Sequence, residues 1–288
     1  MTAEWRKVRG EDARALRDWL AVREEYACGF AWRAFGEPSS VPALESGAAV
    51  FARFEEGAIS GAVLFARGGM VFPVFDSPPD ANAARTLGRF LSLRADAPSS
   101  VTGREADVVA FEALTRLRPS LAVRYMTMRV DAAGAARASA GAAPEGVRVR
   151  RAGPSDLRAL VPVQAAYERE EVLTSMHLFD ARASEAGLER SLASQRVWLA
   201  EVEGRPVAKA QTNARALRLE QAGGIYVAPE FRGRGLGRAV VAALLVDIAS
   251  AGKGATLFVK QGNAVARGLY RALGFEEIGP FRIDYLNP

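Results

Sequence analysis

Apolar residues in the first half of the chain recur at intervals that alternate between helical and extended periods. Within residues 11–27, the side chains of Leu16, Trp19 and Leu20 recur at helical spacing and predict an amphipathic helix. Shorter apolar runs bounded by glycine, proline or serine predict strands, because these residues favour turns. The expected strands lie at 48–54, 61–65, 71–75 and 123–130, with further helices at about 82–93 and 105–117.

The second half shows the same alternation. A strand is expected at 147–150, after which Ser155 or Asp156 can cap a helix that Pro162 kinks or restarts. Strands and helices then alternate around residues 218–278, which predicts a parallel strand pair joined by a right-handed crossover. The other expected elements are strands at 197–202, 207–212, 218–227, 256–259 and 276–286, and helices at 236–250 and 264–273.

Residues 131–146 contain no large apolar side chain and separate the two halves. Such a segment has little surface to bury, which predicts a linker between an N-terminal domain at 1–130 and a C-terminal domain at 147–288. A marginal helix through its alanines is the alternative.

The two halves share the order strand, strand, helix, strand, helix, strand. Short segments also match in sequence and in order: 12–16 is similar to 156–160, and 51–57 is similar to 199–204. This pattern predicts an α/β protein with an internal repeat.

A loop rich in glycine and arginine lies between the expected strand at 218–227 and the helix at 236–250. Glycine lets a backbone approach a ligand closely, and the free N–H groups of a helix's first turn attract anions. A P-loop would need Lys and then Ser or Thr after Gly237, and a dinucleotide fingerprint would need a glycine at Arg238. The loop therefore predicts a phosphate-bearing ligand of another kind.

Two further features flank this loop. Gly223 and Gly224 fall inside the expected strand, where paired glycines are destabilising unless a bulge or a close ligand requires them. Asn263 can cap the helix at 264–273, and Tyr270 lies two turns further on the same face, so both can address one ligand. A core tyrosine whose hydroxyl is tied to the backbone is the alternative for Tyr270.

Together these motifs resemble the GNAT acetyltransferase superfamily. Arg-x-x-Gly-x-Gly at 232–237, preceded by Val-x-Pro-Glu-Phe at 227–231, resembles the family's acetyl-CoA pyrophosphate loop. Asn-x-x-Ala-x-x-Leu-Tyr-x-x-Leu-Gly-Phe at 263–275 is among the family's most specific local patterns. The resemblance covers about residues 147–288, and it implies an α/β fold with a mixed sheet, present as two tandem GNAT-like copies.

The N-terminal half is expected to be a degenerate GNAT-like domain. Where the pyrophosphate loop would lie, residues 76–80 offer two acids and two prolines, and proline has no N–H to donate. An unrelated α/β domain is the alternative.

The resemblance implies acetyl-CoA as a co-substrate and no metal. The pantetheine arm would pair with the strand ahead of the loop, where Ile225 and Val227 are the expected main-chain partners. The residues expected to bind acetyl-CoA are Ile225, Tyr226, Val227, Arg232, Gly233, Arg234, Gly235, Leu236, Gly237, Arg238 and Asn263.

For catalysis, the resemblance gives Tyr270 the role of donating a proton to the leaving thiolate. The main-chain N–H of Val227 would stabilise the oxyanion. Glu220 is the best-placed base to deprotonate the acceptor, with Glu170 and Glu171 as competitors. The acceptor is expected to be a primary amine of a small metabolite or an amino-acid-like compound. A non-catalytic acyl-CoA sensor and a nucleotide-phosphate-binding protein are the alternative functions.

Composition changes this picture little. The chain has 288 residues, 49% of them apolar and 25% charged, which is ordinary for a globular protein. The net charge of +5 comes largely from scattered arginines, so nucleic acid is not an expected partner. No apolar run of about 18 residues is present, so no membrane span is expected. Cys28 and His177 are the single cysteine and histidine, which favours a reducing cytoplasm and excludes a His-rich metal site. A monomer or homodimer is expected.

Overall fold

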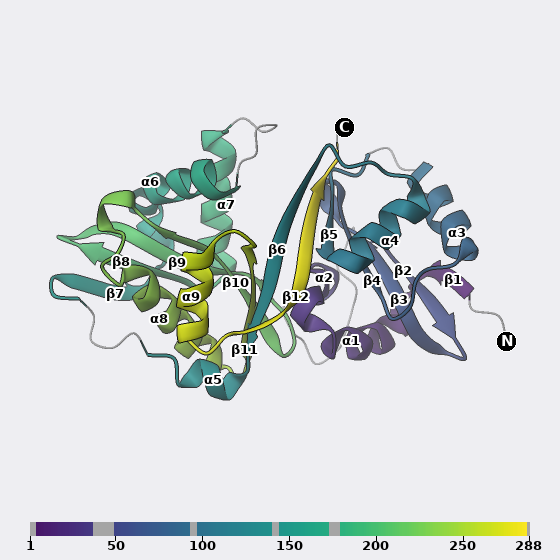
Figure 1. Cartoon of the computed structure of the whole chain (residues 1–288), viewed down its shortest axis with the longest axis horizontal. Coiled ribbons are helices and arrows are strands. Elements are labelled where there is room, and N and C mark those ends of the chain that lie inside the picture. The colour runs from purple at the N-terminus through teal and green to yellow at the C-terminus, as the bar shows by residue number, and fades with distance from the viewer. Residues whose placement is uncertain (1–3, 37–48, 93–96, 140–143, 173–178, 287–288) are drawn as a thin grey trace. The chain divides into compact units, whose positions relative to one another are not determined.

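The computed structural model describes residues 4–36, 49–92, 97–139, 144–172 and 179–286. The chain forms two compact units, drawn as ribbons in Figure 1. Unit 1 comprises residues 1–128, 258–264 and 277–288, and unit 2 comprises 129–257 and 265–276. The sequence did not predict that two C-terminal segments belong with unit 1. The division into domains at 1–130, 131–146 and 147–288 stays a prediction.

The sheet of unit 1 has the strand order β1-β2-β3-β4-β5-β12-β6. The strands from β1 to β4 pair antiparallel, β4 and β5 pair parallel, and β12 pairs antiparallel with β5 from Phe281 opposite Arg104 to Tyr285 opposite Ser100. The strands are β1 (Glu4–Lys7), β2 (Ala49–Glu55), β3 (Ala58–Phe65), β4 (Met70–Phe75), β5 (Ser100–Arg104), β6 (Leu121–Val130) and β12 (Glu276–Tyr285).

Two helices of unit 1, at residues 81–92 and 105–115, cover an aromatic core. Phe65 is almost fully buried, and the centre of its ring lies 4.8 Å from the ring centre of Phe90 and 6.2 Å from that of Phe111. Leu87 and Val101 complete the same cluster, so apolar burial holds the helices on the sheet. The helices are α1 (Ala13–Ala21), α2 (Glu24–Phe35), α3 (Ala81–Ser92) and α4 (Glu105–Thr115).

The sheet of unit 2 has the order β11-β10-β9-β8-β7. The strands from β7 to β10 pair antiparallel, whereas β10 and β11 pair parallel with α8 between them in the chain. The parallel pair expected around 218–278 is therefore confirmed. The strands are β7 (Val147–Arg151), β8 (Val197–Val202), β9 (Arg205–Arg215), β10 (Leu219–Val227) and β11 (Gly254–Lys260).

Two groups of helices pack on this sheet. The largely apolar α8 (Leu236–Ser250) packs against β8, β9 and β10, while α6 (Leu157–Tyr167) packs against α7 (Ala181–Ser194), β9 and β10. A π-helical turn, η4 (Glu168–Val172), extends α6, and α9 (Ala264–Ala272) follows β11.

Part of the expected linker is a helix. Asp131 accepts a hydrogen bond from the N–H of Gly134 at 2.6 Å and caps α5 (Ala132–Ala136), which packs on α8. The alternative of a helix through the alanines is therefore correct for this part of the segment. Residues 140–143 lie outside the described residues.

The internal repeat has a structural counterpart in each unit. Arg6 makes a bidentate ion pair with Asp12 at 2.7 and 2.8 Å, and Arg150 makes the same pair with Asp156 at 2.9 and 2.7 Å. Each aspartate also accepts a bond from a main-chain N–H three residues earlier. The following hairpins turn through Glu-Gly pairs with positive φ at both residues, at 56–57 and at 203–204.

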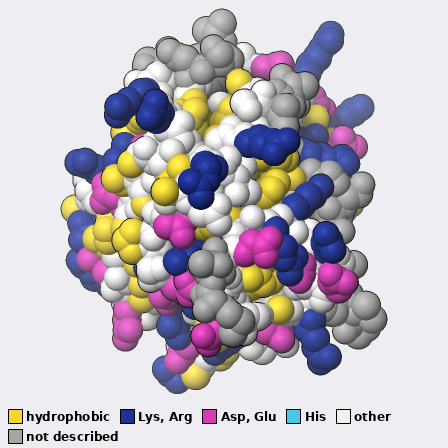
Figure 2. Space-filling model, turned by 90° about the vertical axis from the view of Figure 1, so that its right-hand side faces the viewer, with side chains coloured by type: hydrophobic (Ala, Val, Ile, Leu, Met, Phe, Trp, Pro, Cys, Tyr) yellow, Lys and Arg dark blue, Asp and Glu magenta, His cyan; other side chains and the backbone are white. Residues whose placement is uncertain are grey.

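Two of the expected helices differ in detail from the observed ones. Residues 11–27 do not form one helix, because the chain leaves helical geometry at Arg23, between α1 and α2. Pro162 lies inside the continuous helix α6. Cys28 is buried, and His177 lies outside the described residues. On the face drawn in Figure 2, basic and acidic side chains are interspersed. Within the described ranges, no helix combines the length and apolarity needed to cross a membrane.

Candidate functional site

The glycine loop connects β10 to α8 in unit 2 and leaves the start of the helix open. Gly233 and Gly235 have φ values of +76° and +79°, which residues other than glycine rarely adopt. A Cβ at either position would meet no atom within 4 Å, so backbone conformation rather than crowding requires these glycines. Gly235 precedes the first residue of α8 and is exposed. The free N–H groups of that first turn therefore face a site that suits an anion.

The arginines of the loop have protein partners. Arg232 donates from Nε to the carbonyl of Val227 at 3.0 Å and pairs through Nη2 with Glu170 at 2.6 Å. Arg238 donates to the carbonyl of Ser139 at 3.2 Å, and Arg234 lies over the ring of Phe231. These contacts hold the loop against the end of β10 and leave three positive charges around it.

The strand ahead of the loop contains the expected bulge. Gly223 lies opposite Gln211, and Tyr226 lies opposite Lys209, so two residues of β10 face one residue of β9. Gly224 has φ +57°, and a Cβ there would lie 2.7 Å from Cγ of Gln211. The paired glycines are therefore required because side chains from β9 occupy the space beside them.

The pairing of β10 with β11 is short. Its register runs from Leu219 opposite Gly254 to Gln221 opposite Thr256, which is only the first third of β10. The N–H of Ala228 donates to the carbonyl of Val207, on the β9 side. Because successive N–H groups of a strand point to opposite edges, the N–H of Val227 points toward the β11 side. This edge suits an amide chain that pairs like an added strand.

A hydrogen-bonded cluster joins this strand to η4. The hydroxyl of Tyr226 donates to Glu170 at 2.5 Å, and Arg232 holds the other oxygen of the same carboxylate. The hydrogen bonds from Tyr226 and Arg232 lower the pKa of Glu170. Burial, followed by the bond to Glu170, raises the pKa of Tyr226 to about 12. Glu170 is thus engaged as an acceptor and holds η4 to the loop.

Tyr270 lies in α9 with only 7% of its surface exposed and packs edge-on against Phe275. Burial is the main reason why its pKa is raised, with smaller contributions from Tyr167 and Glu171. Among the described residues, its hydroxyl has no hydrogen-bond partner, so the alternative of a hydroxyl tied to the backbone is not supported. Asn263 directly precedes α9, where it was expected as a cap.

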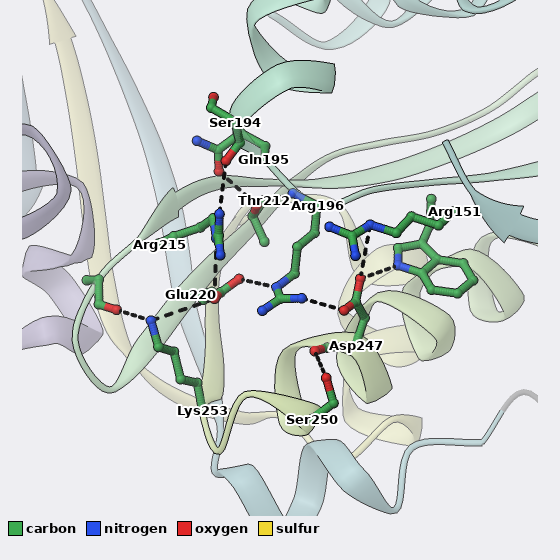
Figure 3. A network of polar contacts seen from close by, with 12 residues as sticks. Arg151, Ser194, Gln195, Arg196, Thr212, Arg215, Glu220, Asp247, Ser250 and Lys253 are labelled. Carbon is green, nitrogen blue, oxygen red and sulfur yellow. Dashed lines mark hydrogen bonds and ion pairs between the residues drawn. The ribbon is translucent and has the colours of Figure 1, made fainter. Parts of the chain in front are cut away.

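Glu220 lies in a different environment from the one expected of a base. It is fully buried, and Arg196, Arg215 and Lys253 surround its carboxylate at 2.9, 3.6 and 3.7 Å (Figure 3). Asp247 extends the network by pairing with Arg196. Its carboxylate is a counter-charge for Arg196, which is buried, and for Arg215 and Lys253, which are partly buried. The surroundings therefore argue for a structural role and against the catalytic role expected from the sequence.

The sequence interpretation missed Lys209, which lies in the middle of β9 and has no exposed surface. Its Nζ donates to Gln211 at 2.9 Å and lies 4.8 Å from the ring centre of Tyr167. Burial lowers the pKa of Lys209 to about 7. A lysine inside the otherwise apolar run Val207–Ala210 was the one sequence signal that could have revealed it.

Comparison with known proteins places these features in a family context. Residues 208–283, from β9 into β12, match the family model described as FR47-like protein. A comparison with curated proteins gave no significant match.

Solved structures are similar to the chain over its whole length. A Drosophila structural-genomics protein has a TM-score of 0.73 at 14% identity, and the match covers 100% of this chain and 99% of that one. A tandem GNAT protein from the clavulanic acid biosynthesis pathway has a TM-score of 0.60 at 14% identity, with the same coverage. An N-acetyltransferase related to GCN5 from Sphaerobacter thermophilus has a TM-score of 0.59 at 18% identity, covering 99% of this chain and 96% of that one.

The similarity thus extends over both units, and the family-model match falls on the strand, loop and helix that the sequence motifs singled out. The fold expected from those motifs is confirmed: the chain has a tandem GNAT-like fold, and its residues 208–283 match the FR47-like family model.

Proposed function

We propose that the protein transfers an acetyl group from acetyl-CoA to a primary amine, using unit 2. The observation that supports this most is the junction of β10 and α8. An exposed helix N-terminus held open by Gly233 and Gly235 follows a bulged strand whose pairing with β11 ends at Gln221. The loop suits the pyrophosphate of CoA, and the free edge of β10 suits the amides of pantetheine.

The proposed reaction needs three groups at the thioester. The amine nitrogen first forms a bond to the acetyl carbon, and the N–H of Val227 stabilises the oxyanion that results. The C–S bond then breaks as the carbonyl re-forms. Tyr270 then gives its proton to the leaving sulfur. Burial raises the pKa of Tyr270, which keeps the hydroxyl protonated until a thiolate is present.

The acceptor is proposed to be a small-molecule amine. Release of CoA from acetyl-CoA, measured with a thiol reagent against a panel of primary amines, tests the function. Tyr270→Phe removes only the hydroxyl, so we expect it to keep acetyl-CoA affinity and to lower kcat by about 100-fold or more. Tight binding of acetyl-CoA without CoA release for any amine would contradict the proposal and favour a sensor. A thermal shift with ATP or NAD but not with CoA would favour a nucleotide-binding protein.

A further inference from the structure

Lys209 occupies an unusual place for a charged side chain. It has no exposed surface, and among the described residues no carboxylate lies within ion-pair distance of its Nζ. Its contacts are the side-chain oxygen of Gln211 and the ring face of Tyr167. A buried ammonium normally pairs with a carboxylate because desolvation penalises the charge, so an unpaired buried amine calls for an explanation.

The amine lies at the bulge of β10. A Cβ at Gly224 would be 2.9 Å from Nζ of Lys209, so Nζ reaches the backbone of the strand where the chain departs from regular pairing. Gly224 contributes no side chain there, and the next residues of β10 run toward the N–H of Val227. The bulge therefore brings Nζ to the segment of β10 on which the proposed function places the reacting thioester.

The titratable groups around Nζ come from three elements. Tyr167 and Glu168, at the end of α6 and the start of η4, face it, and Glu168 favours its charged form. Tyr226 of β10 is its register partner, and its hydroxyl is committed to Glu170. Toward α7, Gln211 continues the hydrogen bonding to the neutral hydroxyl of Ser191.

We propose that Nζ of Lys209 is the base that accepts the proton lost by the acceptor ammonium. This inference rests on the proposed acetyl transfer. Two of the three sequence candidates are already engaged, because Glu220 pairs with three cations and Glu170 accepts bonds from Tyr226 and Arg232. The pKa of the buried Lys209 is close to neutrality, which matches what general-base catalysis requires.

One proton is released for each acetyl group that is transferred. The neutral amine of Lys209 takes one proton from the acceptor ammonium, and the freed amine attacks the acetyl carbon. The attacking nitrogen loses a second proton when the C–S bond breaks, while Tyr270 donates one to the sulfur, and the second proton restores the Tyr270 hydroxyl. Lys209 returns its proton to solvent, so the products are the amide, CoA thiol and one released proton.

The test compares two kinds of acceptor. Lys209→Met is expected to lower kcat/KM by about 100-fold or more for alkylammonium acceptors, which must be deprotonated. The same variant should retain turnover of hydroxylamine, which is uncharged at neutral pH. Lys209→Arg should fail in the same selective way, because a guanidinium stays protonated. Lys253→Met, which removes the lysine of the Glu220 network, is the matched control and should show no such selectivity.

The outcomes separate the two proposals. Equal loss with both kinds of acceptor, or no loss with either, overturns the base role while leaving acetyl transfer intact. Absence of CoA release from the wild type with every acceptor overturns acetyl transfer and the base role together. Without any substrate, a ¹⁵N NMR titration of the Nζ resonance, assigned through Lys209→Met, should give a pKa near 7. A value close to the ordinary lysine pKa of about 10.4 overturns the proposal.

Discussion

Two carboxyl groups, Glu112 of α4 and Asp284 of β12, meet inside unit 1. Asp284 is fully buried and pairs with Arg282 at 2.6 Å, while the side chain of Glu112 is 9% exposed and lies 3.8 Å from the same guanidinium. The single guanidinium of Arg282 therefore lies within ion-pair distance of both carboxyl groups. Burial first, and then the hydrogen bond to Asp284, raise the pKa of Glu112 from 4.5 to about 8. The raised pKa favours the protonated form of Glu112 beside Asp284.

This pair makes the stability of the protein depend on pH. The folded protein keeps a proton on Glu112 that the unfolded chain releases near pH 4.5, so the stabilising contribution is complete below that pH and is lost as the pH rises through about 8. Glu112→Gln stays neutral beside Asp284 at every pH. We expect the variant to remove a decline of at most about 1.4 kcal/mol per pH unit in the free energy of unfolding over this range.

Urea unfolding at a series of pH values measures the effect. Glu11→Gln is a suitable control, because Glu11 is a mostly exposed carboxylate of the same unit. Parallel pH profiles for Glu112→Gln and the wild type would show that the carboxyl pair shares no proton.

Single-residue roles were the part of the site that the sequence could not give. Glu220 lies in β10 just before Gly223 and Gly224, and its sequence neighbours suggest an available carboxylate. It is paired, however, with Arg196 and Lys253, which are more than 20 residues away in the chain. Lys209 is the converse case, since only the packing of Tyr167 over β9 reveals that its amine is buried. Charge pairing and burial depend on side chains from several elements, and one strand's sequence does not contain them.

At the scale of elements, the strand β10 and the loop after it were predictable because glycine conformations are local properties. The bulge between Gly223 and Tyr226 and the positive φ values at 233 and 235 follow from residue types in one short segment. The causes differ between these positions. Gly235 is required by its φ alone, whereas Gly224 is required by its φ and by the side chain of Gln211 beside it.

This difference predicts different costs for two alanine substitutions. Gly235→Ala meets only backbone strain and should lower the free energy of unfolding by about 1–2 kcal/mol. Gly224→Ala adds a collision with Cγ of Gln211 at 2.7 Å and should cost about 2–4 kcal/mol. Gly10→Ala is the control, because Gly10 has neither a positive φ nor a neighbour within 4 Å of a Cβ. Chemical denaturation of the three variants measures the order, and equal costs for Gly224→Ala and Gly235→Ala would contradict it.

At the scale of the whole chain, the shared Arg–Asp pairs and Glu-Gly hairpins support the repeat that the order of elements predicted. The sequence could not show that β12, at the end of the chain, pairs with β5 of unit 1, because strand pairing between distant segments leaves no local pattern. The two units also differ where their parallel strands are joined. In unit 2 the connection leaves the N-terminus of α8 exposed. In unit 1 the corresponding connection runs from β4 into α3.

The start of α3 carries its own negative charge. Asp80 accepts a bond from the N–H of Ala83 at 2.9 Å, so a carboxylate occupies the place that a phosphate would take. Asp76, four residues earlier, accepts bonds from Trp19 and Arg23 at 2.7–3.1 Å. Both contacts support the prediction that unit 1 is a degenerate GNAT-like domain without a pyrophosphate loop.

The absence of such a loop predicts the stoichiometry of binding. We expect isothermal titration calorimetry to give one acetyl-CoA per chain, because only the N-terminus of α8 is free of a competing carboxylate among these two helices. Gly235→Ala should weaken that single site, since strain at φ +79° displaces the N–H groups of the first turn. Asp80→Ala should leave the stoichiometry at one, because the two prolines at 78 and 79 still offer no N–H. Two equivalents bound by the wild type, or one equivalent that persists at full affinity in Gly235→Ala, would place acetyl-CoA outside the β10–α8 junction.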